Sequence, residues 1–410
     1  MKDEAYLVLA NGCVFAGKSF GHRACVFGEA VFTTGMEGYL ETLTDPSYYG
    51  QIVTQTFPLI GNYGIIPKDF ESSSCHFRAY IARNFCDTPS NFRSEKTIDD
   101  FLKANKVVGL YDIDTRALVK MLREVGVMNA LVISGESDEA ANYKNALLNP
   151  TKKTRLLQKI KAFKITNAVE AVTKDADKIA ESAKHIFSEA EQYRAVPIKK
   201  DGTKIMRFSE STKSGKGKRV VLWDFGAKAN IRRELLKRGL FVETISANAS
   251  AEEILKRKPD AIMLSNGPGD PAENVSIISN LKKLCAKRIP IFGICLGHQL
   301  LALAKGAKTT KLKYGHRGAN QPVKQLKTGR VYISSQNHGY AVENKSLPKC
   351  ARLSFVNAND GTCEGLEYTD IPAFSVQFHP EAAGGPLDLN FLFDDFVEMI
   401  QANCKVRSKK

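Results

Sequence analysis

The sequence has 410 residues, of which 43% are hydrophobic and 25% are charged; this excludes a disordered, collagen-like or coiled-coil chain and predicts two or three globular domains. No apolar run approaches the ~18 residues of a membrane span, no basic and apolar leader opens the chain, and nine cysteines occur without a CxxC pair, so we expect a cytoplasmic protein with no membrane partner. The net charge of +15 does not predict a nucleic-acid partner, because residues 152–219, with 18 basic and 8 acidic side chains, carry most of it.

The first part of the chain is rich in short β-favouring runs. Apolar and β-branched residues fill much of positions 5–34 and are separated by glycines such as Gly12 and Gly17, which favour turns. Residues 97–125 then show apolar positions at helical spacing. We predict a smaller, β-rich α+β domain over residues 1–150.

Residues 12–19 (GCVFAGKS) satisfy the phosphate-loop pattern GxxxxGK[ST] letter for letter. A phosphate loop needs flexible residues around the phosphates and a helix that starts at the lysine. Here Cys-Val-Phe favours a strand, and a further β-favouring run follows the serine. We therefore reject a nucleotide site here and expect no cofactor in this chain.

The second half of the chain begins after a basic segment. We interpret residues 151–218 as a linker or insert with one helix, over residues 174–191. From residue 219 strands and helices alternate, which predicts a doubly wound parallel sheet in an α/β domain over residues 219–410. In such a sheet the chemistry lies at the carboxyl ends of the strands.

The residues around Cys295 have the pattern of a nucleophile elbow. In PIFGICLGHQLLALA a buried type of strand leads to Cys295, Gly293 and Gly297 flank it, and a helix begins at once. Small neighbours permit the sharp turn, and a helix N-terminus favours a thiolate over a thiol. The turn also directs the N–H of Leu296 toward an oxyanion. We predict that Cys295 is a nucleophile and that the other eight cysteines are structural.

His379 is the expected base for this thiolate. In FHPE, His379 and Glu381 are two residues apart, so an extended chain presents both on one face and Glu381 can orient the ring. His298 and His338 compete for this role, but His298 would lean along its own helix with no carboxylate nearby in sequence. No Cys/His spacing matches a zinc site, so we predict no metal in this chain.

The loop LSNGPGDP (264–271) follows a predicted strand and contains two glycines and a proline. Such a loop lets backbone amides approach a ligand closely, although an ordinary turn is the alternative interpretation. A parallel sheet places the loop beside the Cys295 turn. We therefore expect Gly267 to supply a second N–H to the oxyanion.

GICLGHQ around Cys295, FHPE with His379 and Glu381, and SNGPGDP together resemble the class I glutamine amidotransferase domain, over roughly residues 219–402. The resemblance implies that the cysteine attacks the side-chain amide of glutamine and that ammonia leaves. Water then hydrolyses the thioester while the histidine carries protons.

Three further segments resemble one branch of this family, the small chain of glutamine-dependent carbamoyl phosphate synthetase. They are GEAVFTTGMEGYLETLTDPSYYGQIVTQTFPLIGNYG (28–64), DFGAKANI (224–231) and YGHRGANQPV (314–323). The resemblance implies a Cys295–His379–Glu381 triad and a glutamine site with one residue, Ser47, from the first domain. The residues carried over to that glutamine site are Ser47, Gly267, Gly269, Leu296, Gln299, Asn337, Gly339 and Tyr340, the last standing where many relatives have Phe.

The resemblance also implies a partner. A large synthetase chain would use ATP and Mg to make carbamoyl phosphate from bicarbonate and the released ammonia, for arginine and pyrimidine biosynthesis, in a heterodimer that docks through the first domain. Two alternatives stay open: a glutaminase of another synthase, such as an anthranilate- or GMP-making enzyme, and a regulatory relative without catalysis. The TDPSY and PLIGNYG segments argue against the first, and the intact triad argues against the second.

Overall fold

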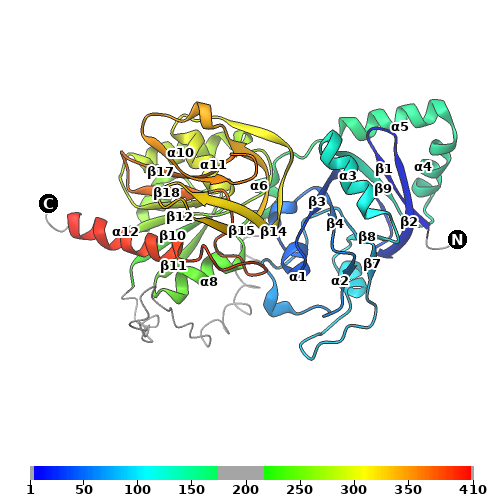
Figure 1. Ribbon diagram of the computed structural model, residues 1–410, viewed down its shortest axis with the longest axis horizontal. Coiled ribbons are helices and arrows are strands. Elements are labelled where there is room, and N and C mark those ends of the chain that lie inside the picture. The colour runs from blue at the N-terminus through cyan, green and yellow to red at the C-terminus, as the bar shows by residue number, and fades with distance from the viewer. Residues whose placement is uncertain (1–3, 174–216, 408–410) are drawn as a thin grey trace. The chain divides into compact units, whose positions relative to one another are not determined.

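The computed structural model describes residues 4–173 and 217–407, which divide into two compact units (Figure 1). The first unit comprises Met1–Ala168, Lys311–Asn320 and Asn337–Gly339. The second comprises Val169–Thr310, Gln321–Gln336 and Tyr340–Lys410. The helix predicted over residues 174–191 lies outside the described residues. No helix in the described part of the chain is long and apolar enough to cross a membrane.

The first unit contains a closed barrel of seven strands in the order β1-β2-β8-β6-β4-β3-β9. The pairs β3–β4, β4–β6 and β6–β8 are parallel, and the other pairs are antiparallel. Alternate side chains, among them Leu7, Ile52 and Val132, fill one fully buried core. The barrel strands are β1 (Glu4–Leu9), β2 (Val14–Gly21), β3 (Cys25–Thr33), β4 (Gln51–Gln55), β6 (Ala79–Ile81), β8 (Val108–Tyr111) and β9 (Met128–Ile133), and β5 (Leu59–Ile60) pairs separately with β7 (Asn84–Phe85). The predicted β-rich α+β domain is confirmed.

The phosphate-loop match lies on strand β2. Residues 14–21 are extended and pair with β1 and β8, and Lys18 lies opposite Tyr111 in this ladder. The lysine forms an ion pair with Asp112 at 3.1 Å. Because no helix starts at Lys18, the strand interpretation is confirmed.

Five helices of the described residues accompany the barrel, and several begin at a side chain that caps them. Asp114, one of two residues that could cap the helix expected within 97–125, accepts the N–H of Ala117 at 2.9 Å. In α5 the side chains of Leu156 and Ile160 are buried against the barrel, so the first part of the predicted linker packs as a helix on the first unit. The helices are α1 (Tyr39–Leu43), α2 (Ile98–Ala104), α3 (Thr115–Val125), α4 (Asp138–Leu148) and α5 (Pro150–Ala162).

The second unit is built on a nine-stranded sheet in the order β11-β10-β12-β13-β18-β17-β16-β14-β15. The first five strands are parallel, and four of them are the strands expected from the alternating pattern. They are β10 (Arg219–Asp224), β11 (Phe241–Ser246), β12 (Ala261–Leu264), β13 (Ile291–Ile294) and β18 (Ala373–Val376). The predicted parallel α/β sheet is confirmed.

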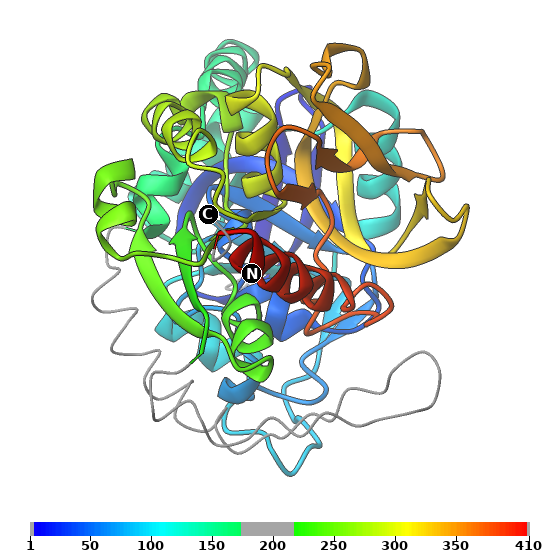
Figure 2. The same cartoon turned by 90° about the vertical axis from the view of Figure 1, so that its left-hand side faces the viewer.

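Helices cover both faces of this sheet. Along β10 the side chains alternate, so that Val221 and Trp223 join the core beneath α9, α10 and α11, whereas Val220 and Leu222 join the core beneath α8 and α12. Figure 1 shows α10 and α11 on one side of the strands and α8 and α12 on the other, and α12 (red) lies in front of the strands in the view of Figure 2. The helices of this unit are α6 (Ala168–Thr173), α8 (Ala229–Lys237), α9 (Ala251–Lys256), α10 (Val275–Cys285), α11 (Leu296–Ala304) and α12 (Leu392–Arg407).

An antiparallel extension widens the sheet beyond what the sequence predicts. After β18 the strands β17, β16 and β14 pair antiparallel with one another. The long strands contribute residues 311–320 and 337–339 to the first unit and their other residues to the second. These strands are β14 (Thr309–Gln325), β15 (Val331–Val342), β16 (Ala351–Asn357) and β17 (Cys363–Tyr368).

Replacing Phe292 by Ala should destabilise the second unit by about 3–5 kcal/mol, the usual cost of a cavity left by a buried phenylalanine. Phe292 lies on β13, fully buried, with its ring centroid 4.4 Å from that of Phe374 and 5.6 Å from those of Phe393 and Phe396. Urea unfolding followed by the emission of Trp223, the single tryptophan, reports on this unit.

The matched control is Phe241→Ala, because Phe241 on β11 is 43% exposed and should cost less than about 1 kcal/mol. Equal shifts of the two urea midpoints would contradict the assignment of Phe292 to the core.

Candidate active site

Cys295 sits at a strained turn between β13 and α11. Its backbone has φ 52° and ψ −103°, in the left-handed half of conformational space, which residues other than glycine rarely adopt. Its N–H donates to the Val376 carbonyl of the neighbouring strand at 2.8 Å, and its carbonyl accepts the N–H of Gln299 at 3.1 Å. The side chain is buried at the N-terminus of a nine-residue helix, a position that favours a thiolate.

The two glycines around Cys295 are required by space. A Cβ atom on Gly293 would lie 2.8 Å from the Gly297 carbonyl oxygen, and one on Gly297 would lie 2.5 Å from the Leu264 carbonyl oxygen. Both distances are shorter than a van der Waals contact. The atoms that a Cβ would meet belong to the backbone, so a side chain at either position would displace the main chain. The elbow expected from the glycine pattern is therefore what the backbone forms, and Leu296, the first residue of α11, has no partner for its N–H within the helix.

His379 and Glu381 form a buried pair downstream of β18. The imidazole Nδ1 lies 2.6 Å from Oε1 of Glu381, and both side chains are fully buried. The main chain is held by a hydrogen bond from His379 N–H to the Ser335 carbonyl at 2.8 Å. Nε2 of His379 has no hydrogen-bond partner among the residues that the structure describes. With a proton on Nδ1, this nitrogen presents a lone pair.

The environment keeps Glu381 ionised. Burial alone would raise the pKa of its carboxyl, but the charge and hydrogen bond of His379, together with Lys228, hold that pKa below its usual range. Lys228 Nζ lies 3.7 Å from Oε1 of Glu381. Asn230, at the start of α8, donates its side-chain N–H to the Glu381 carbonyl. The acid is therefore held by Lys228 and Asn230 at the start of α8 as well as by His379.

A chain of side-chain amides, which the sequence analysis did not predict, leads to the sulfur of Cys295. Nε2 of Gln299 donates to the Tyr340 carbonyl at 2.7 Å and to Oε1 of Gln377 at 2.9 Å. Nε2 of Gln377 lies 3.6 Å from Sγ of Cys295. One sequence feature could have indicated Gln377: it lies two residues before His379, and His379 lies two residues before Glu381. In an extended chain all three side chains would lie on one face.

The loop with Gly267 and Gly269 lies at the carboxyl end of β12, which pairs with β13. A Cβ on Gly267 would lie 2.3 Å from the Phe225 carbonyl oxygen and 2.8 Å from a methyl group of Leu296, so the loop packs directly against the residue after Cys295. Gly269 has φ 90°. The structure therefore brings together five of the predicted glutamine-site residues, all in the second unit: Gly267, Gly269, Leu296, Gln299 and Tyr340.

The ring nitrogens of His298 contact residues other than Cys295. Its Nδ1 lies 2.8 Å from the Ser375 hydroxyl, and its Nε2 lies 3.9 Å from Sγ of Cys363. Complete burial lowers the pKa of this imidazole to about 3. His298 is therefore a core residue, kept neutral by burial and with both ring nitrogens in contact with buried side chains, which is consistent with the preference for His379.

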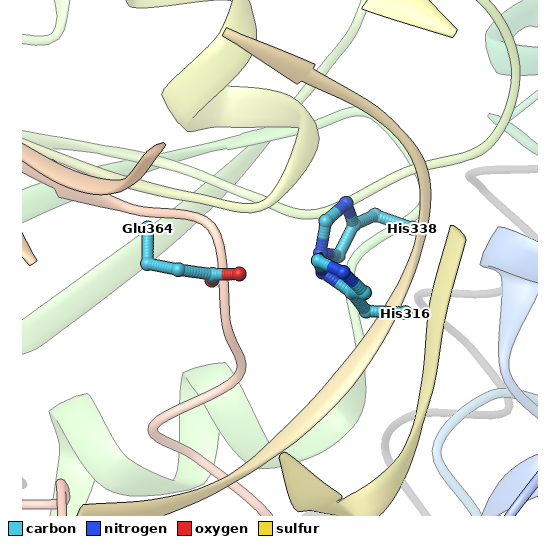
Figure 3. A group of neighbouring side chains, drawn as sticks. All are labelled: His316, His338 and Glu364. Atoms are coloured by element: carbon cyan, nitrogen blue, oxygen red, sulfur yellow. The ribbon is translucent and has the colours of Figure 1, made fainter. Parts of the chain in front are cut away.

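His338 belongs to the first unit, in the middle of β15. Its Nε2 lies 3.3 Å from Nδ1 of His316 on β14, and the two rings meet edge to face with centroids 4.9 Å apart (Figure 3). The two buried imidazoles therefore face each other within one unit.

The remaining predicted glutamine-site residues also lie in the first unit. The Asp45 carboxylate accepts the N–H of Ser47 at 2.9 Å and the side-chain N–H of Asn337 at 2.9 Å, so it joins two segments that are far apart in sequence. Gly339 follows two residues after Asn337 on β15. Asp45 was not among the predicted site residues. Its position two residues before Ser47 is typical of an Asx turn, in which the carboxylate accepts the backbone N–H two residues later.

Two family matches cover most of the described residues. Residues 221–399 match Glutamine amidotransferase class-I, and residues 7–132 match Carbamoyl-phosphate synthase small chain, CPSase domain. The second unit is thus a class I glutamine amidotransferase domain, in agreement with its parallel sheet and its cysteine elbow.

Full-length relatives specify the family further. The carbamoyl phosphate synthase small chain of Clostridium perfringens is 45% identical over 96% of this chain and 99% of its own length. The carbamoyl phosphate synthase pyrimidine-specific small chain of Bacillus subtilis is 45% identical over 97% of this chain and 96% of its own. Among solved structures, a glutamine amidotransferase of Thermotoga maritima is 20% identical, with a TM-score of 0.33 over 40% of this chain and 76% of its own. The chain belongs to the carbamoyl phosphate synthase small-chain family.

The neutral state of His298 should make the second unit sensitive to acid. The unfolded imidazole gains a proton below about pH 6.5 and the folded one does not, so the unfolded state binds more protons and stability falls as the pH drops from 6.5 toward 3. Between pH 7.5 and pH 5.0 the free energy of unfolding should fall by about 2 kcal/mol more in the wild type than in His298→Gln. The slope is about 1.4 kcal/mol per pH unit below about pH 6.5. Urea midpoints from Trp223 emission measure both losses, and equal losses in the two proteins would refute the prediction.

Proposed function

We propose that this chain hydrolyses glutamine through Cys295, His379 and Glu381 and supplies the ammonia to a large carbamoyl phosphate synthetase chain. One observation carries the proposal. Glu381 is buried and holds the ring of His379 through Nδ1, and Nε2 of that ring has no hydrogen-bond partner among the described residues. Both residues lie in the segment that follows β18, and β18 pairs directly with β13, the strand that leads into Cys295. Family membership supports glutamine as the substrate.

The first half-reaction forms the thioester. Nε2 of His379 accepts the proton of the Cys295 thiol, and the sulfur electron pair forms a bond to the amide carbon of glutamine while the C=O pair moves onto oxygen. As the oxyanion collapses, the C–N bond breaks and His379 returns the proton to the leaving nitrogen, which departs as ammonia. Glu381 keeps the other ring proton on Nδ1 and stabilises the imidazolium between these transfers.

The second half-reaction releases glutamate. Water loses a proton to Nε2 of His379 and attacks the thioester carbon. The C–S bond then breaks with its electron pair returning to sulfur, and His379 gives the proton to that sulfur. The N–H of Leu296, at the start of α11, and that of Gly267 are the donors that we assign to the oxyanion in both steps. Gly269, Gln299 and Tyr340 complete the substrate contacts of the second unit, and Ser47, Asn337 and Gly339 are those assigned to the first.

The division of labour follows from this chemistry. Glutamine hydrolysis by the triad needs no cofactor and no metal, and we assign ATP and Mg to the large chain, which activates bicarbonate and phosphorylates carbamate. The product would serve arginine and pyrimidine biosynthesis, and the Bacillus subtilis relative is named as pyrimidine-specific. We assign the docking of the large chain to the first unit.

Cys295→Ala should abolish glutamine-dependent carbamoyl phosphate synthesis and leave ammonia-dependent synthesis intact, because only the release of ammonia needs the thiol. The assay measures ammonia and carbamoyl phosphate from the small chain, alone and with its large chain, ATP and bicarbonate. We expect weak glutaminase activity alone and a strong increase with the partner.

The matched control is Cys285→Ala, which removes another buried thiol at the end of α10. Loss of ammonia-dependent synthesis in Cys295→Ala would refute the division of labour. Strong glutaminase activity that ignores the large chain would refute the partnership.

Glu381→Ala should lower kcat for glutamine hydrolysis less than His379→Ala does. The histidine transfers protons, a contribution of about 10²–10⁴-fold, whereas the glutamate orients and stabilises the ring. Steady-state kinetics of both variants in the complex measure the difference, with Glu367→Ala, an exposed carboxylate on β17, as the control. A larger loss in Glu381→Ala than in His379→Ala would contradict these roles.

A further inference from the structure

The side-chain amide of Gln377 contacts the sulfur of Cys295, although Gln377 is not part of the proposed triad. Its Nε2 lies 3.6 Å from Sγ of Cys295, within the range of a hydrogen bond to sulfur. Gln377 is fully buried and Cys295 is 3% exposed, so water does not readily substitute for this donor. The Gln377 main chain is held as well, because its N–H donates to the Glu364 carbonyl at 2.9 Å.

The neighbouring hydrogen bonds decide which end of this amide faces the sulfur. The Tyr340 carbonyl oxygen can only accept, so Gln299 must present its NH₂ group there. The same NH₂ group of Gln299 lies 2.9 Å from the Gln377 side chain, which must therefore present its oxygen to Gln299. The NH₂ group of Gln377 is left to face Sγ. A backbone carbonyl thus sets the orientation of two successive amides.

We propose that Gln377 is a further catalytic residue, which stabilises the Cys295 thiolate by donating a side-chain N–H to Sγ, and that Gln299 is its positioning residue. This inference rests on the proposed function of Cys295 as the nucleophile. A donor to the charged form of an acid favours that form, and hydrogen bonds to charged groups are stronger than those between neutral groups.

The same hydrogen bond serves both half-reactions. Before the first, it stabilises the thiolate that attacks the amide carbon. In the second, the C–S bond breaks and its electron pair returns to sulfur, where the N–H of Gln377 again meets a developing negative charge. The contact is weakest in the thioester between these steps, because the sulfur is then neutral. Gln377 therefore stabilises the negative charge on sulfur both when the sulfur attacks and when it leaves.

The arrangement also restricts how Gln299 contacts the substrate. Both hydrogens of its NH₂ group are used, one on Tyr340 and one on Gln377. Only its Oε1 remains to meet glutamine, as an acceptor. Gln299 would thus connect substrate binding to the amide that faces the sulfur.

The test is the rate at which iodoacetamide alkylates Cys295 as a function of pH, in the full chain without glutamine. Mass spectrometry of the peptide that contains Cys295 separates this thiol from the other eight. Gln377→Met keeps the size of the side chain and removes the donor, and it should raise the midpoint pH by about one to two units, which corresponds to about 1.5–3 kcal/mol. Gln299→Met should raise the midpoint in the same direction, and the double variant should raise it no further than Gln377→Met alone.

Two further variants keep the result decisive. Ser375→Ala removes a buried hydrogen bond two residues away, from the hydroxyl to His298, and should leave the midpoint unchanged. Gln377→Asn, whose amide is too short to reach the sulfur, replaces Gln377→Met if Trp223 emission shows that the latter does not fold. An unchanged midpoint in the folded Gln377 variant, or an equal shift in Ser375→Ala, would overturn the proposal.

The outcome is separable from that of the proposed function, because alkylation requires neither glutamine nor the large chain. If Cys295→Ala still released ammonia, the glutaminase assignment would fall whatever the alkylation midpoints were. If the midpoint did not respond to Gln377, the role of Gln377 would fall while the triad kept its own test.

Discussion

A single backbone conformation, φ 52° at Cys295, is the constraint on which the site in the second unit depends. A residue with a side chain pays of order 1–3 kcal/mol for such a conformation, so the surroundings must hold it in place. They do so from three sides. The strand before it and the helix after it are buried, its N–H is bonded to β18, and the flanking glycines let backbone segments approach closer than any Cβ allows. The result is a cysteine whose backbone is fixed by the strand before it, the helix after it and the neighbouring strand β18.

The buried polar groups of the site depend on each other in a similar way. Glu381 and His379 are fully buried, and Lys228 is close to the same carboxylate. A buried charge without a partner is strongly destabilising, whereas a matched and hydrogen-bonded set is tolerated. The contacts that complete the set come from the start of α8 and from β15, at Asn230 and Ser335. Removing one member should therefore disturb the position of the others, and we expect the kinetic losses of single variants not to be additive.

The sequence predicts much of this site because its constraints are local. Gly293 and Gly297 indicate a sharp turn, and the spacing of His379 and Glu381 places them on one face of an extended chain. Gln377 carries no charge and no distinctive spacing with Cys295, so its contact with the sulfur follows only from the pairing of β13 with β18. The antiparallel strands β14 to β17 were likewise not predicted, because long strands shared between two units alternate irregularly between buried and exposed positions. The glutamine-site roles of all eight residues stay a prediction: Ser47, Gly267, Gly269, Leu296, Gln299, Asn337, Gly339 and Tyr340.

The order of the sheet also determines when the site can exist. Strand β13, which leads into Cys295, lies beside β18, and β18 follows it in the chain only after α11 and strands β14 to β17. Contacts between segments so distant in sequence form late, because the intervening chain must be ordered first. A growing or partly folded chain therefore contains Cys295 before His379 and Glu381 are in place. With the roles proposed above for Cys295 and His379, the thiol would meet its base only once the rest of the domain is in place.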